Sequence, residues 1–101
     1  MKILLCCKAG VTSNMFATAL KEEAGKKGID VNVWAAAETA VAYSIDRADI
    51  VLVTPQLRSS LRKFEDLADS ETPVILISDD DFINFNAKKV LEEALAQKEQ
   101  M

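Results

Sequence analysis

Short apolar runs alternate with helical patterns along the chain, and this alternation constrains the fold more than any other feature. The apolar runs cover residues 2–6, 30–34, 49–53 and 73–77. The helical patterns cover residues 14–27, 38–46, 56–68 and 86–98. Apolar runs of about five residues indicate strands, and strands alternating with helices predict a parallel sheet with right-handed crossovers. The chain is therefore expected to adopt an α/β fold with helices on both faces of the sheet.

The apolar runs differ in composition, and the difference predicts their places in the sheet. Residues 2–6, 49–53 and 73–77 are almost continuously apolar, as in strands covered on both faces, whereas residues 30–34 alternate like an edge strand. Ligands of such sheets bind beyond the carboxyl ends of the strands, so the loops after the strands are expected to carry the chemistry. These loops are residues 7–13, 35–37, 54–58 and 78–85.

The length and composition of the chain predict one folded domain. A chain of 101 residues has room for a single core, and we assign residues 1–101 to one domain. Half of the residues are hydrophobic, and only three are glycine and two proline, which is typical of a globular protein rather than a disordered one.

Charge and residue types argue against several classes of function. The net charge of −4, without a large cluster of Lys and Arg, argues against nucleic acid and against an anionic membrane surface as partners. No apolar stretch approaches the roughly 18 residues of a membrane-spanning helix, so no direct membrane insertion is expected. The chain has no histidine and no Cys-x-x-Cys spacing, and we assign no metal and no cofactor. Cys6 and Cys7 are poorly placed to bridge each other, which points to a reducing cytoplasm.

Residues Cys7 to Ser13, reading Cys-Lys-Ala-Gly-Val-Thr-Ser, join the first predicted strand to the first predicted helix. Free backbone N–H groups and the positive end of the helix dipole meet at such a junction, which favours phosphate binding and the thiolate form of a cysteine. Small residues let the backbone approach an anion, hydroxyl groups add donors, and a lysine adds positive charge. These residues are Ala9, Gly10, Thr12, Ser13 and Lys8. The loop therefore predicts a thiol at Cys7 that carries a phosphoryl group.

The two cysteines also have a simpler interpretation as packing residues. Cys6 still belongs to the predicted strand, and we interpret it as part of the core. Cys7 could be a small buried hydrophobe at the end of the strand, because free cysteines often are. From the spacing alone, this alternative for Cys7 stays open.

Two sequence elements stand in the order found in one known family. The first is Cys-Lys-Ala-Gly-Val-Thr-Ser at residues 7–13, and the second is Ala-Asp-Ile-Val-Leu-Val-Thr-Pro-Gln-Leu at residues 48–57, which spans the third strand and the turn after it. With the four-strand layout they resemble, over nearly the whole chain, the IIB component of the lactose/cellobiose (chitobiose) branch of the bacterial sugar phosphotransferase system. The resemblance implies a four-stranded parallel sheet of order 2-1-3-4 with helices on both faces, a flavodoxin-like three-layer sandwich.

The resemblance also implies a function, that of a cytoplasmic phosphocarrier peripherally associated with a membrane permease. Such a protein accepts a phosphoryl group from a phosphohistidine of a IIA protein and passes it to a sugar, here a β-linked disaccharide such as cellobiose or lactose, that the membrane IIC protein translocates. Cys7 matches the phosphorylated cysteine of this phosphotransferase, and Pro55 and Gln56 match the loop beside it. The phosphate-binding loop corresponds to Lys8, Ala9, Gly10, Val11, Thr12 and Ser13.

Two features of the sequence depart from the family pattern. Thr54 stands where many relatives have glycine before Pro-Gln, a change from which we expect little effect. The loop after the fourth strand contains Asp79, Asp80 and Asp81, whose charges would repel a phosphoryl group unless they face solvent. We interpret this run as a solvated lead-in to a helix, capped by an Asp or Ser side chain.

Other cysteine- or phosphate-based proteins share parts of this pattern. Low-molecular-weight tyrosine phosphatases and arsenate reductases carry a Cys-x5-Arg loop between a strand and a helix, but the sixth residue after Cys7 is Ser13, so hydrolysis would lack its guanidinium. A redox or binding module that uses Cys6 and Cys7 is the second alternative. A receiver domain does not fit, because the third strand leads to Thr54 and Pro55 rather than to an aspartate.

Basic residues near the same edge of the sheet suggest contact with a partner. Arg58 and Arg62 share one helix face at i,i+4 spacing, and we hypothesise that they help to dock an acidic partner or to steer phosphate. A solvated face, on which they pair with neighbouring carboxylates, is the alternative. Met15 and Phe16 are interpreted as part of the helix core, with the alternative that one of them, together with Val11, forms an apolar rim around the thiol.

Overall fold

The computed structural model describes residues 1–8 and 11–99, with residues 11–13 described without their side chains. This part of the chain contains one sheet of four parallel strands in the order β2-β1-β3-β4. The strands are β1 (Lys2–Cys7), β2 (Asn32–Ala37), β3 (Ile50–Val53) and β4 (Val74–Leu76). The parallel sense, the strand order and the edge position of β2 confirm the predictions made from the sequence.

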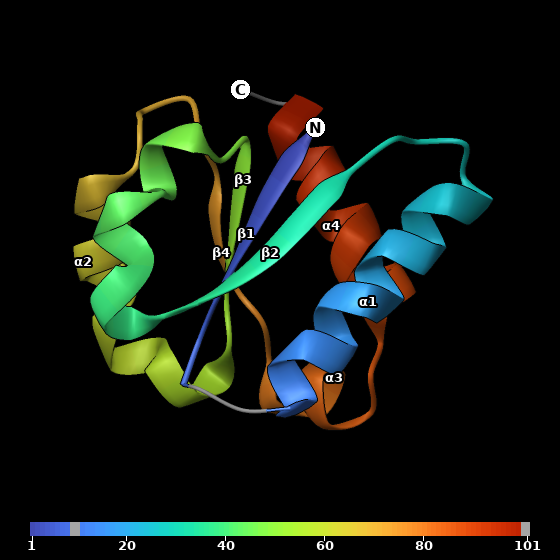
Figure 1. Cartoon of the computed structure of the whole chain (residues 1–101), viewed down its shortest axis with the longest axis horizontal. Coiled ribbons are helices and arrows are strands. Elements are labelled where there is room, and N and C mark those ends of the chain that lie inside the picture. Colours follow the sequence, from blue (N-terminus) through green and yellow to red (C-terminus); the bar gives the residue numbers. More distant parts are fainter. Residues whose placement is uncertain (9–10, 100–101) are drawn as a thin grey trace.

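Helices cover both faces of the sheet, so the molecule has three layers (Figure 1). One face is covered by α1 (Val11–Lys26) and α4 (Ala87–Glu99), with the short α3 (Asp79–Ile83) beside them. The other face is covered by α2 (Leu61–Leu67) and by short 3-10 helices. The 3-10 helices are η1 (Glu38–Tyr43), η2 (Ile45–Arg47) and η3 (Pro55–Ser60). This architecture confirms the predicted flavodoxin-like sandwich.

Two hydrophobic clusters, one on each face of the sheet, hold the layers together. Successive residues of a strand point to opposite faces. β1 therefore contributes Ile3 and Leu5 to the α1-side cluster, which lies against α1 and α4. It contributes Leu4 and Cys6 to the α2-side cluster. Burying one large aliphatic side chain contributes about 1.5–3 kcal/mol, which is why strands covered on both faces carry continuous apolar runs.

β2 lies further along the chain than predicted. The strand was expected at residues 30–34, but β2 runs from Asn32 to Ala37, and the prediction of a loop at residues 35–37 is wrong. Residues 35–37 pair with Leu5, Cys6 and Cys7 of β1. This pairing outweighs the low strand preference of alanine, so three consecutive alanines extend the sheet.

Most of the predicted helices are present. Those at residues 14–27 and 86–98 are α1 and α4, and the one at 56–68 is η3 followed by α2. The helix expected at residues 38–46 is instead a pair of 3-10 helices, η1 and η2. Within the part of the chain that the structure describes, no helix is both long and apolar enough to cross a membrane.

The segment around β4 differs from the prediction in two ways. β4 is less completely covered than its continuous apolar run predicts, because Leu76 at its end is 40 % exposed. The loop expected at residues 78–85 contains the helix α3. A helix of five residues is too short to produce a recognisable period, and the exposure of Leu76 depends on how the helices cover the sheet, which composition does not encode.

Candidate functional site

The carboxyl ends of the strands place several predicted site residues at one edge of the sheet. Cys7 is the last residue of β1, a central strand, and lies opposite Ala37 of β2. On the other side Cys6 lies opposite Val53 of β3, and the Thr54 N–H donates to the Cys6 carbonyl at 3.0 Å. Cys7 is therefore flanked by Ala37 and Thr54 at the edge where ligands of parallel sheets bind.

The thiol of Cys7 contacts the neighbouring strand. Cys7 Sγ lies 3.7 Å from the carbonyl oxygen of Ala36 and donates a weak hydrogen bond to it. Cys7 is only 4 % exposed, so its side chain is largely shielded from bulk water. Unlike Cys6, Cys7 lies outside the two clusters formed by the described residues. It is a buried residue at the tip of a strand rather than a member of the core.

Cys6 is a packing residue. It is fully buried in the α2-side cluster. Burial, and in second place the neighbouring Cys7, raises the pKa of the Cys6 thiol to about 12, so this thiol stays protonated at neutral pH and is a poor nucleophile. The prediction that Cys6 belongs to the core is confirmed.

The predicted phosphate-binding loop lies partly outside the described residues. Those outside are Ala9, Gly10 and the side chains of Val11, Thr12 and Ser13. Lys8 is exposed. α1 begins at Val11 and continues for 16 residues, with no acidic residue in its first turn. The strand-to-helix junction after Cys7 is confirmed, and phosphate binding by the loop stays a prediction.

The loop after β3 turns directly into η3 beside Cys7. Pro55 occupies the start of η3, where a helix needs no backbone N–H, and the exposed Gln56 follows it. Thr54 flanks the start of η3, but its side chain does not cap that helix. Thr54 is fully buried, and its Oγ1 has no hydrogen-bond partner among the residues that the structure describes. Nothing in the sequence pattern signals a role for this hydroxyl.

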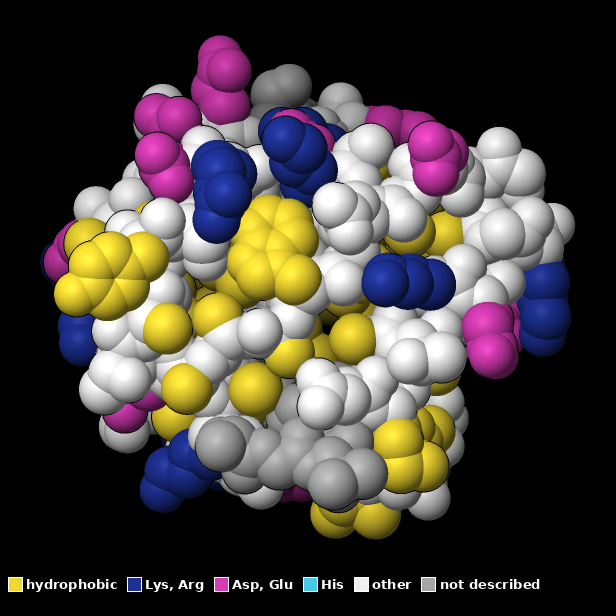
Figure 2. Space-filling model, viewed as in Figure 1, with side chains coloured by type: hydrophobic (Ala, Val, Ile, Leu, Met, Phe, Trp, Pro, Cys, Tyr) yellow, Lys and Arg dark blue, Asp and Glu magenta, His cyan; other side chains and the backbone are white. Residues whose placement is uncertain are grey.

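The two arginines proposed for partner contact are paired with carboxylates. Arg58 forms an ion pair with Asp79 at the start of α3, and Arg62 Nε lies 3.8 Å from Asp66 Oδ1. All four side chains are more than half exposed. The pairing of Arg62 with Asp66 is the one expected on a solvated face. Basic and acidic side chains are also mixed on the face of the molecule that Figure 2 shows. Docking of a partner by the arginines stays a prediction.

The acidic segment after β4 forms the capped start of α3. Ser78 Oγ accepts a hydrogen bond from the Asp81 N–H at 3.1 Å, which confirms the predicted cap. Asp79 and Asp80 are exposed, as predicted. Among the described residues, no group of three or more His, Cys, Asp or Glu side chains is placed to hold a metal ion.

Asp81 differs from the two preceding aspartates because its side chain is buried. Its Oδ1 accepts hydrogen bonds from Asn86 Nδ2 at 3.0 Å and from Lys89 Nζ at 3.3 Å. These bonds, chiefly the one from Asn86, hold the pKa of the Asp81 carboxyl below its usual range. The prediction that the whole acidic run is solvated is therefore wrong at Asp81, whose charge is compensated inside the protein.

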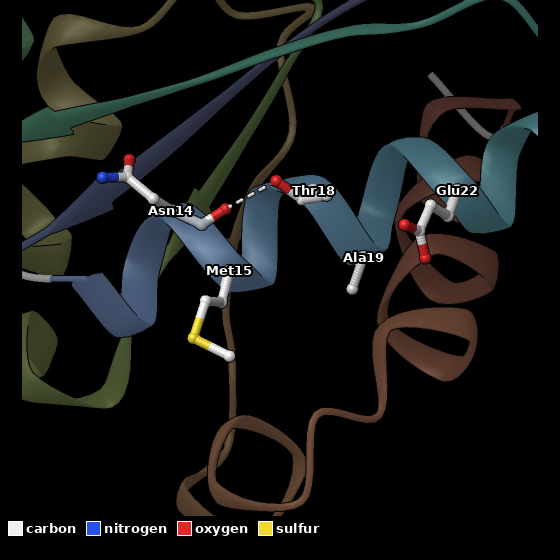
Figure 3. Close-up of a pocket in the computed structure, with 5 residues that line it drawn as sticks. All are labelled: Asn14, Met15, Thr18, Ala19 and Glu22. Atoms are coloured by element: carbon white, nitrogen blue, oxygen red, sulfur yellow. Dashed lines mark hydrogen bonds between the residues drawn. The ribbon is translucent and has the colours of Figure 1, made fainter.

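Aromatic and apolar side chains surround the first turns of α1. Phe16 is buried and packs against Phe82 of α3, with ring centroids 5.4 Å apart. Met15 is 55 % exposed, so the core interpretation is confirmed for Phe16 and wrong for Met15. Met15 lines a shallow depression of about 320 Å³ along α1, and Met15 and Ala19 project from the same side of the helix (Figure 3).

Comparison with known sequences finds one family and a similar protein. Residues 2–93 match the family model described as PTS system, Lactose/Cellobiose specific IIB subunit, where PTS stands for the phosphotransferase system. The chain is also similar to the PTS system oligo-beta-mannoside-specific EIIB component of Bacillus subtilis (strain 168). The two are 32 % identical, and the match covers 94 % of this chain and 93 % of that protein.

Solved structures share the fold. The cellobiose-specific phosphotransferase IIB component of Borrelia burgdorferi is 32 % identical, with a TM-score of 0.79, and the match covers 99 % of this chain and 93 % of that one. The lactose-specific IIB component domain of Streptococcus pneumoniae also gives a TM-score of 0.79, at 23 % identity, and the match covers 96 % of each chain. At that identity the second comparison supports the fold alone.

Proposed function

Since this chain belongs to the lactose/cellobiose-specific IIB family of the phosphotransferase system, we propose that it is a phosphocarrier whose phosphorylated atom is the sulfur of Cys7. The donor is a phosphohistidine on a IIA protein, and the acceptor is a hydroxyl group of a sugar that a membrane IIC protein translocates. The observation that carries the proposal is the place of Cys7 at the end of a central strand, just before the segment that leads into α1. Helix N-termini favour bound phosphate and the thiolate form of cysteine.

The reaction consists of two displacements at phosphorus. In the first, the Cys7 thiolate attacks the phosphohistidine, the S–P bond forms as the P–N bond breaks, and the imidazole nitrogen takes up the proton that the thiol released. In the second, the sugar oxygen attacks, the O–P bond forms as the S–P bond breaks, and the hydroxyl proton restores the thiol. No water takes part, so the site has to position the reacting groups and keep water out.

The described residues support these steps in three ways. Backbone N–H groups in the first turn of α1 lack partners within the helix and so stabilise the transferred charge. The low exposure of Cys7 keeps bulk water from the sulfur. The carboxylate of Asp81 is compensated by Asn86 and Lys89, which limits its repulsion of a phosphoryl group.

We further propose that the sugar is a β-linked disaccharide and that the chain works in the cytoplasm beside its permease. The matching proteins are named for cellobiose, lactose and oligo-beta-mannosides, which share a β-glycosidic bond. In this scheme the IIC protein selects the sugar, and only the reacting hydroxyl meets Cys7. Both cysteines are free thiols, which fits a reducing compartment.

The proposal is tested by phosphorylating the chain with phosphoenolpyruvate, the two general phosphotransferase proteins and a cognate IIA protein. Intact mass should show one added phosphoryl group, which Cys7→Ser loses and Cys6→Ala retains. The adduct should persist until IIC and sugar are supplied. An adduct on Cys6, no adduct, or steady release of inorganic phosphate without sugar would contradict the proposal.

A further inference from the structure

The hydroxyl of Thr54 is a buried polar group beside Cys7 that the described residues leave unsatisfied. Thr54 is fully buried, and its Oγ1 forms no hydrogen bond with any residue that the structure describes. Native proteins rarely bury a hydroxyl group without a partner, because the group has lost its hydrogen bonds to water. Such a group therefore suggests a partner that arrives in another state of the protein.

The strand register places Thr54 next to Cys7. Cys6 and Val53 are paired across β1 and β3, and the Thr54 N–H donates to the Cys6 carbonyl at 3.0 Å. Thr54 is thus one residue beyond the last pair, at the level of Cys7. Neighbouring strands are about 4.8 Å apart, a separation that brings adjacent side chains on one face close together.

The side chains of Thr54 and Cys7 lie on the same face of the sheet. Cys6 and Val53 both pack in the α2-side cluster. Because successive strand residues alternate between the two faces, Cys7 and Thr54 point to the α1 side. Cys7 thus has on one side the Ala36 carbonyl of β2, which accepts a weak hydrogen bond from its thiol at 3.7 Å, and on the other side Thr54, which directly follows β3.

We propose that the Thr54 hydroxyl donates a hydrogen bond to an oxygen of the phosphoryl group on Cys7, an inference that rests on the proposed function. No hydrogen bond joins Thr54 to Cys7 while the sulfur carries only a proton; a phosphoryl group adds oxygens beyond the sulfur, and the proposal places one of them within reach of the Thr54 hydroxyl. The bond is charge-assisted, because its acceptor is anionic. A donor that is already buried and positioned stabilises the charge without reorganisation.

Two other polar side chains near this edge have partners among the described residues. Ser78 Oγ accepts a hydrogen bond from the Asp81 N–H at the start of α3. Arg58 donates to the Pro55 carbonyl and pairs with Asp79. The Thr54 hydroxyl, in contrast, is buried beside Cys7 and has no partner among the described residues.

The variants Thr54→Val and Thr54→Ser test the proposal. Valine has nearly the shape of threonine but no donor, whereas serine keeps the donor. With the chain and the IIA protein mixed in equal amounts, intact mass gives the fraction of each that is phosphorylated at equilibrium. Thr54→Val should shift this equilibrium towards phospho-IIA roughly tenfold or more, and Thr54→Ser should stay near the original chain. The 31P NMR shift of the thiophosphate should change in Thr54→Val only.

Thermal unfolding of the unphosphorylated variants separates this role from a structural one. Thr54→Val should be at least as stable as the original chain, since it replaces a hydroxyl that has no partner in that state. A lower Tm for Thr54→Val, or an unchanged phosphoryl equilibrium, would overturn the proposal. If the original chain takes up no phosphoryl group at all, the proposed function fails first. If it is phosphorylated but Thr54→Val behaves identically, only the Thr54 assignment fails.

Discussion

The guanidinium of Arg58 in η3 binds the carboxylate of Asp79 in α3, with Arg58 Nη2 lying 2.8 Å from Asp79 Oδ1 and 2.7 Å from Oδ2. Arg58 Nε also donates to the Pro55 carbonyl at 3.0 Å. The side chains of Arg58 and Asp79 are 59 % and 61 % exposed, so water and salt weaken their attraction and the pair contributes at most about 1 kcal/mol to folding. The contact ties the start of η3 to the start of α3 at the edge that carries Cys7.

Reversing the charge of Arg58 and Arg62 should slow phosphoryl transfer from the IIA protein to this chain. If the two arginines attract an acidic surface of IIA, Arg58→Glu with Arg62→Glu lowers the transfer rate about tenfold at low salt. The effect should shrink at high salt, because ions screen exposed charges. Quenched-flow measurement of phospho-Cys7 formation at a low and a high salt concentration gives the transfer rate under each condition.

Two further variants separate docking from folding. Asp79→Asn breaks the ion pair with Arg58 but leaves the guanidinium positive, so transfer should not slow. Lys26→Glu with Lys98→Glu makes the same change of charge near the far ends of α1 and α4 and should leave the rate close to that of the original chain. If the arginine reversal leaves transfer unchanged at low salt, Arg58 and Arg62 do not belong to the docking surface.

Acidification should destabilise the chain through Asp81. The pKa of this carboxyl is lower in the folded chain than in the unfolded chain, chiefly because Asn86 donates to it. Its stabilising contribution is therefore complete above the usual aspartate pKa of about 3.9 and is lost as the pH falls through the folded-state value. Asp81→Asn should lower the Tm at neutral pH and should matter progressively less as the pH falls below about 4.

The exposed Asp80 provides the matched control for Asp81. Asp80→Asn removes the same charge one residue earlier, where the side chain faces solvent, and should change the Tm at neutral pH by much less than Asp81→Asn. Thermal unfolding of both variants across this pH range measures the difference. A Tm loss for Asp81→Asn that is equal at neutral and acidic pH would show that the carboxylate charge is not what stabilises the fold.

Cys6 should resist alkylation in the folded chain. At about pH 8 a thiol with a pKa of about 12 is almost fully protonated, and Cys6 is also buried, so iodoacetamide should modify it only after unfolding. The Cys7→Ser variant leaves Cys6 as the sole thiol, and its mass before and after treatment in native buffer and in urea measures the reaction. Equal labelling rates in the two solutions would contradict its place in the core.

Sequence reasoning succeeded where the pattern of a segment is strong. The continuous apolar run of β1 predicts a doubly covered strand, and the period of residues 14–27 predicts α1. The junction between them follows directly, so Cys7 is found as a candidate from sequence alone. Sequence reasoning failed where contacts made in the fold decide the outcome and the local pattern is weak. The alanines of β2 form a strand because they pair with β1. Asp81 is buried because Asn86 and Lys89 bind its carboxylate.

The amino-acid sequence by itself determined the order of strands and helices and the position of Cys7 between β1 and α1, because hydrophobic periodicity is a property of neighbouring residues. Only the tertiary structure decided that the Thr54 hydroxyl lies beside Cys7 and that Arg58 meets Asp79. These contacts depend on the register between β1 and β3 and on how the loops fold back over the sheet. They join residues far apart in the chain, and no local pattern corresponds to them.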